Sequence, residues 1–182
     1  MKMRTIAIGL LLLAASAVQL PAAETNASAP SAARRSATFP DEELCELLAR
    51  AAQEESREMG IGVSFAVADE SGDLLFFKRM DDALPVSVML VPKKAWTAAK
   101  LRTATGNLTR EVAPDGSLFG IHSSDARFVV IAGGFPLFRD GRCVGAIGVD
   151  GGTAEQDDAI GRRVLRVYEK ILDERKDAAH GN

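Results

Sequence analysis

Apolar residues recur along this chain with two spacings, one typical of helices and one typical of strands. The helical spacing follows Pro40, where the acidic run Asp41–Glu43 suits the positive end of a helix, and it stops at Gly60 or Gly62. Pro92 suits the first turn of a second helix. The predicted helices span residues 41–60, 92–101 and 154–175, with a short helix at 105–112.

Larger and smaller residues alternate after Gly62, and this period of two predicts a strand. Asp140-Gly141 lies between two apolar runs and favours a two-residue hairpin, because both positions accept positive φ. Tight hairpins make neighbouring strands antiparallel. The predicted strands span residues 63–69, 74–79, 127–132, 135–139 and 142–149. The chain is therefore expected to be an α+β domain with helices packed on a five-stranded antiparallel sheet.

The strand at residues 74–79 has apolar side chains on both faces, with Leu74 and Phe76 on one face and Leu75 and Phe77 on the other. A sheet that is apolar on both faces has to be covered on both. The pattern therefore predicts a second helix layer or an interface between copies of the chain.

A glycine-lined loop precedes the last predicted helix, and such a loop can cradle phosphate at a helix N-terminus. Here Thr153 and Gln156 form a capping box, in which each side chain can bond the other residue's amide. Asp150 and neighbouring carboxylates also crowd this end and repel anions. The sequence carries neither a phosphate-binding lysine motif nor the dinucleotide fingerprint. The loop is predicted to start a self-capped helix, and nucleotide binding is disfavoured.

The length of 182 residues suits one domain with additional terminal segments. A net charge of −3 gives no reason to expect a nucleic-acid partner. Residues 1–23 have the positive start, apolar core and small residues of a signal peptide, and the core of about 13 residues falls short of the roughly 20 that span a bilayer. We expect a flexible segment at 24–37, a domain at 38–175 and a flexible tail at 176–182. The mature protein is expected to be exported, periplasmic in a Gram-negative source, without a stable membrane anchor.

Export allows a disulfide between Cys45 and Cys143, since such bonds persist in oxidising compartments. The count of cysteines alone permits this pairing, and two separate buried thiols are the alternative.

Few residues suit a metal. His122 is the candidate iron ligand, although an ordinary loop histidine bonded to a neighbouring serine is the simpler interpretation. Met80, Met89 and Tyr168 are possible second ligands for a haem iron, which needs only one or two axial ligands. A basic helix could receive ligand carboxylates or could be a solvated face. Its cations are Lys93, Lys94, Lys100 and Arg102.

Several short motifs, in this order and spacing, resemble the GlcG/HbpS family, the haem-degrading domain family that is similar to the C-terminal domain of PduO-type proteins. The resemblance covers roughly residues 41–171. The motifs that carry it are Val67-Ala68-Asp69 with Gly72, Arg79-Met80-Asp81 with Ala83, Lys94-Ala95-Trp96-Thr97-Ala98, Gly133-Gly134-Phe135-Pro136-Leu137, and Val144 to Val149 with Gly151 and Glu155-Gln156-Asp157.

The resemblance implies a profilin- or PAS-like fold, assembly into homo-oligomers and, for some members, binding of haem. Two positions depart from the family pattern: Asp150 replaces the usual Ser, and Pro92 precedes the Lys-Ala-x-Thr-Ala helix. The resemblance implies an exported haem-binding or haem-handling protein. The alternatives are an enzyme or accessory protein acting on a small, glycolate-like organic acid, and a structural oligomer without a small ligand. The candidate site residues are Lys94, Thr97, His122, Gly134, Phe135, Pro136 and Asp150.

Overall fold

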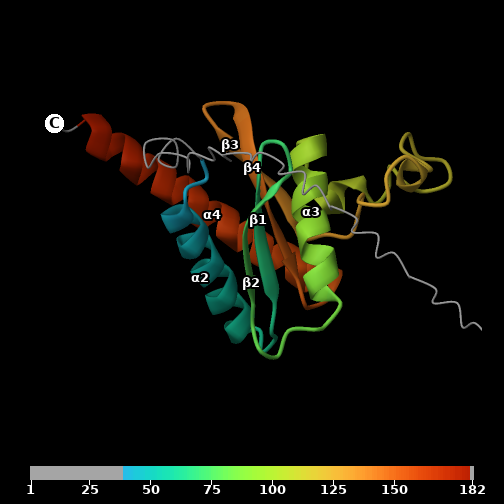
Figure 1. Ribbon diagram of the computed structural model, residues 1–182, viewed down its shortest axis with the longest axis horizontal. Coiled ribbons are helices and arrows are strands. Elements are labelled where there is room, and N and C mark those ends of the chain that lie inside the picture. The colour runs from blue at the N-terminus through green and yellow to red at the C-terminus, as the bar shows by residue number, and fades with distance from the viewer. Residues whose placement is uncertain (1–38, 181–182) are drawn as a thin grey trace, which may run out of the picture. The chain divides into compact units, whose positions relative to one another are not determined.

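The computed structural model describes residues 39–180 (Figure 1). The predicted signal peptide at 1–23 and the predicted flexible segment at 24–37 lie outside the described residues. Within this range an antiparallel sheet separates two helical layers. Helices α2 (Glu42–Glu58) and α4 (Ala154–His180) cover one face, and α3 (Ser87–Leu101) covers the other. The predicted α+β class is confirmed, and both faces of the sheet are covered by helices.

The sheet has four strands in the order β2-β1-β4-β3. Their bounds are β1 Ser64–Asp69, β2 Leu74–Arg79, β3 Gly134–Arg139 and β4 Arg142–Asp150. All three pairings are antiparallel, and β2 and β3 are the two edges. The predicted hairpin at Asp140-Gly141 is confirmed, since their φ angles are 50° and 76°.

The prediction of a fifth strand at residues 127–132 was wrong. This segment has no strand pairing, and side chains bond its backbone instead. The Thr97 hydroxyl accepts from the Val129 amide at 3.0 Å, and the Thr105 hydroxyl donates to the Ile131 carbonyl at 2.7 Å. Threonine hydroxyls therefore satisfy backbone groups of this apolar segment that strand pairing would satisfy in a sheet.

Two helix boundaries also differ from the prediction. Helix α3 begins at Ser87 and contains Pro92, which had been expected to start it. A proline inside a helix removes one backbone hydrogen bond, and the packing of Val91 and Ala95 against β1 outweighs that loss here. Helix α4 continues to His180, beyond the predicted end at Arg175. The short helix expected at 105–112 is the 3-10 turn η1 (Thr105–Leu108), and a second such turn, η2, covers Ile121–Ser123.

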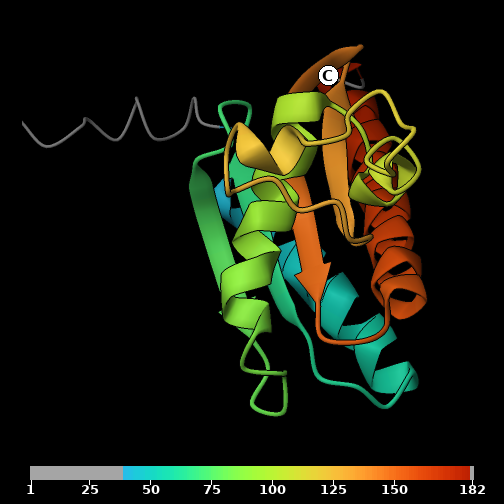
Figure 2. The ribbon, with the colours of Figure 1, turned by 90° about the vertical axis from the view of Figure 1, so that its right-hand side faces the viewer.

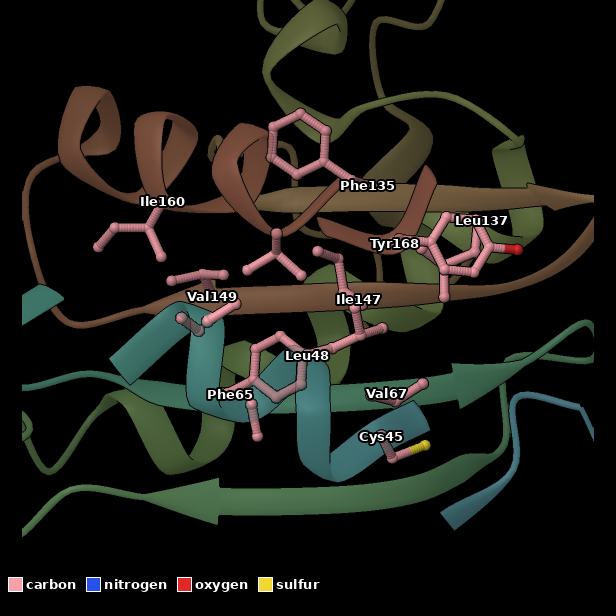
Figure 3. Close-up of a cluster of buried hydrophobic side chains, with 14 of the residues drawn as sticks. Cys45, Leu48, Phe65, Val67, Phe135, Leu137, Ile147, Val149, Ile160 and Tyr168 are labelled. Atoms are coloured by element: carbon pink, nitrogen blue, oxygen red, sulfur yellow. The ribbon is translucent and has the colours of Figure 1, made fainter. Parts of the chain in front are cut away.

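The main core lies between the sheet and the helix pair α2 and α4 (Figure 3). Phe65, Val67, Ile147 and Val149 come from the two central strands, and Tyr168 comes from α4 (Figure 3). On the opposite face small residues such as Ala66 and Ala68 allow α3 to approach closely. Large residues on one face and alanines on the other explain why two helices pack on one side and one on the other.

Cys45 and Cys143 are both free and buried, which agrees with separate thiols and excludes the disulfide in this structure. Burial, together with the Asp41 carboxylate, raises the pKa of the Cys45 thiol to about 12. None of the helices within residues 39–180 is long and apolar enough to cross a membrane.

Candidate functional site

A fully buried lysine is the centre of an ion cluster where α3, β4 and α4 meet. The Lys94 ammonium lies 2.6 Å from an Asp150 carboxylate oxygen and 2.7 Å from an Asp157 carboxylate oxygen. It also donates to the Val149 carbonyl at 3.0 Å. An ammonium has three donors, and these three acceptors use all of them. Lys94 and Asp150, both predicted site residues, are therefore partners of each other in the interior.

Asp157 is the most constrained carboxylate of this cluster. One of its oxygens faces Lys94, and the other accepts a hydrogen bond from the Gly152 amide at 3.0 Å. Burial raises the pKa of Asp157 in spite of the nearby ammonium, and the Asp150 charge acts in the same direction. Two carboxylates share one cation here, so the buried cluster has an excess of negative charge when both are ionised.

The turn at Gly133 and Gly134 is packed closely against α3. The Gly134 amide donates to the Thr105 hydroxyl at 2.9 Å, and a Cβ on Gly133 would lie 3.2 Å from the Lys94 ammonium nitrogen. Gly133 also has a φ of 114°, which favours glycine. Gly134 and Thr97, two predicted site residues, are both buried and hydrogen-bonded. Together with the bond from the Val129 amide to Thr97, they hold residues 127–134 in place.

A groove runs beside this turn between α4, β3 and the segments around η1. It consists of a pocket of about 680 Å³ and a pocket of about 350 Å³, which share Asn107 and Arg162. Apolar lining residues include Val130, Ile131 and Ala132 in the first pocket, and Phe135, Pro136, Phe138, Leu165 and Tyr168 in the second. Both volumes fall within the range of ligand pockets, roughly 300 to 1,000 Å³.

Two arginines line the groove among these apolar residues. Arg162 is exposed, pairs with Asp158 at 2.6 Å and lies 5.7 Å over the Phe135 ring. Arg102 ends α3 in a left-handed conformation and lines the smaller pocket. Glu155 and Asp158 line the larger pocket and offset part of this positive charge. The groove thus combines apolar surface with cations that can bind carboxylates.

Tyr168 lines the smaller pocket of the groove. Its hydroxyl donates to the Phe138 carbonyl at 3.1 Å, and burial raises the pKa of Tyr168 to about 12. The phenol therefore stays protonated at neutral pH, which makes it a poor metal ligand. Met80 lies against the core with its sulfur accepting from the Ser56 hydroxyl, and Met89 is exposed at the start of α3.

His122 is exposed in η2 and lies outside the lining of the groove. Its Nδ1 is 3.1 Å from the Phe128 carbonyl oxygen, so the loop-histidine interpretation holds with a different partner from the neighbouring serines. Within the part of the chain that the structure describes, no three His, Cys, Asp or Glu side chains form a metal-binding group.

A smaller pocket of about 200 Å³ lies on the other side of the sheet, between the β1–β2 turn and α3. Trp96 is its aromatic wall, with the Arg127 guanidinium 4.3 Å over the ring and Lys93 also in the lining. Arg127 is already paired with Asp125 through contacts as short as 2.6 Å. Of the four cations of the predicted basic helix, only Lys93 lines this pocket.

The structure thus brings together only some of the predicted site residues. Phe135 and Pro136 line the groove, whereas Lys94, Thr97, Gly134 and Asp150 are absent from its lining and His122 lies apart. The sequence interpretation missed Asn107 and Arg162 as groove residues and Asp157 as a buried acid. Asp157 had a signal, because it lies three residues before the apolar Ile160 on the buried face of α4.

Comparison with known proteins gives a family match over most of the described domain. The model of a family described as haem degrading protein HbpS-like matches residues 41–166. The chain is 36% identical over 125 residues to a 15.0 kDa protein from the dhaT-dhaS intergenic region of Citrobacter freundii, which covers 68% of this chain and 88% of that protein.

Two further matches involve PduO. The chain is 40% identical over 119 residues to the corrinoid adenosyltransferase PduO of Salmonella typhimurium, covering 65% of this chain and 35% of that enzyme. The match thus spans about a third of PduO. A crystal structure of a PduOC:haem complex is similar with a TM-score of 0.67 and 37% identity, covering 69% of this chain and 92% of that chain.

Proposed function

We propose, from the premise that this chain belongs to the HbpS-like family, that it is an exported haem-binding protein. The observation that carries the proposal is the groove between α4 and β3, with its apolar walls and its two arginines. A porphyrin needs a broad apolar surface for its ring and cations for its two carboxylates. The haem complex of a structurally similar PduO domain supports the same ligand class.

In this proposal the groove residues have distinct roles. Ile131 and Pro136, which solvent can reach, contact the apolar ring, and Arg102 and Arg162 receive its carboxylates. Asp158 holds Arg162 in place before the ligand binds, at the cost of competing with a carboxylate for the same guanidinium. When bound, haem would supply an iron centre for redox or oxygen chemistry.

The groove lining contains no imidazole or thioether, so iron ligation is a separate question from binding of the ring. His122 is kept as the candidate iron ligand, on a loop outside the groove. Its Nδ1 is engaged by the Phe128 carbonyl, which leaves Nε2 as the nitrogen that could bind a metal.

Titration of the protein with hemin, followed by the Soret absorbance, tests the proposal. We expect saturable binding with one haem per chain, and about tenfold weaker binding when Arg102 and Arg162 are both changed to alanine, which corresponds to about 1.4 kcal/mol. Arg166→Ala is the matched control, since this arginine is exposed on the same helix and lies outside the groove lining. Uptake that never saturates would refute haem binding.

The variant His122→Ala distinguishes ring binding from iron ligation. If His122 ligates the iron, the Soret maximum shifts in this variant while the groove variant loses affinity. An unchanged spectrum with unchanged affinity would remove the ligand assignment and leave the groove proposal intact.

Export is part of the same proposal and rests on the sequence of residues 1–23. Mass spectrometry of the protein isolated from its natural compartment should find a new N-terminus near residues 17–23. Retention of Met1 in the folded protein would contradict it.

A second candidate function follows from the pocket beside Trp96. Lys93 and Arg127 could hold the carboxylate of a small, glycolate-like acid there, and the pocket of about 200 Å³ suits a molecule of that size. Thermal-shift measurements with millimolar glycolate and lactate test it, because a bound ligand raises the melting temperature by mass action. Absence of a shift with both acids would exclude this candidate.

A further inference from the structure

The pocket beside Trp96 carries charges of both signs. Its charged lining residues are the cations Lys93 and Arg127 and the acid Asp73. Asp125 already pairs with Arg127 through contacts of 2.6 to 3.1 Å, which makes that pair neutral. One cation and one anion, Lys93 and Asp73, remain for a ligand. A ligand with a carboxylate alone would be attracted by the first and repelled by the second.

The turn between β1 and β2 fixes the position of Asp73. The Asp69 carboxylate accepts from the Ser71 amide at 2.8 Å and from the Asp73 amide at 2.9 Å. Gly72, with a φ of 84°, lets this turn lie against the indole, since a Cβ there would be 2.7 Å from Cδ1 of Trp96. Figure 2 shows the turn beside α3. Asp73 is therefore held in place before a ligand binds, and this lowers the entropic cost of binding.

The two remaining charges have capacity for new hydrogen bonds. Among the described residues the Lys93 ammonium donates one bond, to the Ala126 carbonyl at 3.3 Å, so two of its three N–H groups are left. Within residues 39–180 the Asp73 carboxylate makes no hydrogen bond and no ion pair. The hydrogen bond to Asp125 raises the pKa of Arg127, and the Asp73 charge adds to this effect. Asp73 is thus close enough to interact with cations of the same pocket.

We infer that this pocket binds a small α-amino acid as its zwitterion, with the ligand's carboxylate on Lys93 and its ammonium on Asp73. Charge-assisted hydrogen bonds of this kind are the strong ones. The volume of about 200 Å³ restricts the ligand to a short side chain, which contacts the apolar part of the lining. That part consists of Ala68, Leu74 and Pro92. The inference rests on the second candidate function, because it uses the same pocket, and it is independent of whether haem binds in the groove.

Fluorescence of Trp96 tests the inference, because this is the only tryptophan of the chain and it lines the pocket. Titrations compare L-alanine with L-lactate and glycine with glycolate, two pairs in which an ammonium replaces a hydroxyl group. Each amino acid should bind at least about tenfold more tightly than its hydroxy acid. Hydroxy acids that bind as tightly as the amino acids would overturn the inference and support the second candidate function. No fluorescence change with any of the four would overturn both.

Two variants separate the two ionic contacts. Asp73→Asn removes the anion and keeps the backbone bonds of the turn, so the affinity for alanine should fall at least about tenfold while the affinity for lactate does not fall. Lys93→Met should weaken both ligands. Asp173→Asn is the matched control, since Asp173 is exposed on α4, which covers the opposite face of the sheet. Unchanged alanine binding in Asp73→Asn would overturn the inference. An equal loss for alanine and lactate would do the same, because it would show that Asp73 acts on the shape of the pocket.

Discussion

Replacement of Lys94 by methionine should destabilise the protein more than any other single lysine substitution on α3. The change removes the cation and leaves Asp150 and Asp157 buried without a partner. Removing one member of a buried ion pair typically costs about 3–5 kcal/mol. For a chain of this length each kcal/mol lowers the melting temperature by about 2–4 °C, so the expected decrease is about 10 °C.

The loss should depend on pH in a defined direction. Burial already raises the pKa of Asp157 above its ordinary value of 3.8, so the folded state holds this proton more tightly than the unfolded state. Its contribution to stability is complete below pH 3.8 and is lost as pH rises through the raised pKa. Without the ammonium of Lys94 the pKa of Asp157 rises further, and this window extends to higher pH. The variant should therefore lose more stability at pH 8 than at pH 5.

Urea unfolding followed by circular dichroism at both pH values measures the effect. Lys100→Met is the matched control, because Lys100 lies on the same helix, is exposed and should change stability by less than about 0.5 kcal/mol. The triple variant Lys94→Met/Asp150→Asn/Asp157→Asn should recover more than half of the loss, since no charge remains buried. A Lys94→Met protein within about 1 kcal/mol of the unaltered one at pH 8 would refute the reasoning, because it would mean that the cluster tolerates uncompensated carboxylates.

Three other outcomes follow from the same structure. Asp150→Asn keeps an oxygen beside the Lys94 ammonium and removes surplus negative charge, so the free energy of unfolding in urea should change by no more than about 1 kcal/mol. A loss as large as that of Lys94→Met would contradict this. Gly161→Ala would improve helix propensity by about 1 kcal/mol, yet its Cβ would overlap the Phe135 ring. We therefore expect urea unfolding to show a net loss of about 1–3 kcal/mol in the free energy of unfolding. A gain would show that the ring can move aside. Because burial raises the pKa of Cys45 to about 12, this thiol should react with a disulfide reagent at pH 8 only after unfolding, and rapid reaction of the native protein would disagree.

Local signals in the sequence predicted local structure well. Asp140-Gly141 forms the hairpin because its two residues take the positive φ angles that the turn requires. Thr153 and Gln156 form the predicted capping box, with amide-to-side-chain distances of 2.9 and 3.3 Å. These features depend only on residues a few positions apart. The start of α3 lacked such a signal, since Val86 caps it without a side-chain hydrogen bond, and the prediction therefore depended on Pro92 alone.

The burial of Lys94 depends on residues distant in the sequence. The sequence prediction placed all the basic residues of α3 on one basic face because of their charge. Lys94 instead lies at helical spacing from Val91, Ala95 and Ala98, all of which face the sheet. A charge at an apolar position of one helix, together with Asp157 at an apolar position of another, was a signal for an internal pair. The groove had no comparable signal, because its lining is assembled from several separate segments of the chain.

Gly133 lies against the buried ion cluster of Lys94, Asp150 and Asp157. The residue before it, Ala132, lines the groove. A Cβ on Gly133 would lie 3.2 Å from the Lys94 ammonium nitrogen and 3.0 Å from the Asp157 Cβ, so a larger residue would not fit against the cluster here. We expect an anion bound in the groove to add to the negative charge around Asp157 and to make its neutral acid more favourable. Proton uptake and anion binding would then be thermodynamically coupled, and each would strengthen the other by the same factor. A ligand with carboxylates should be taken up more tightly as the compartment becomes more acidic.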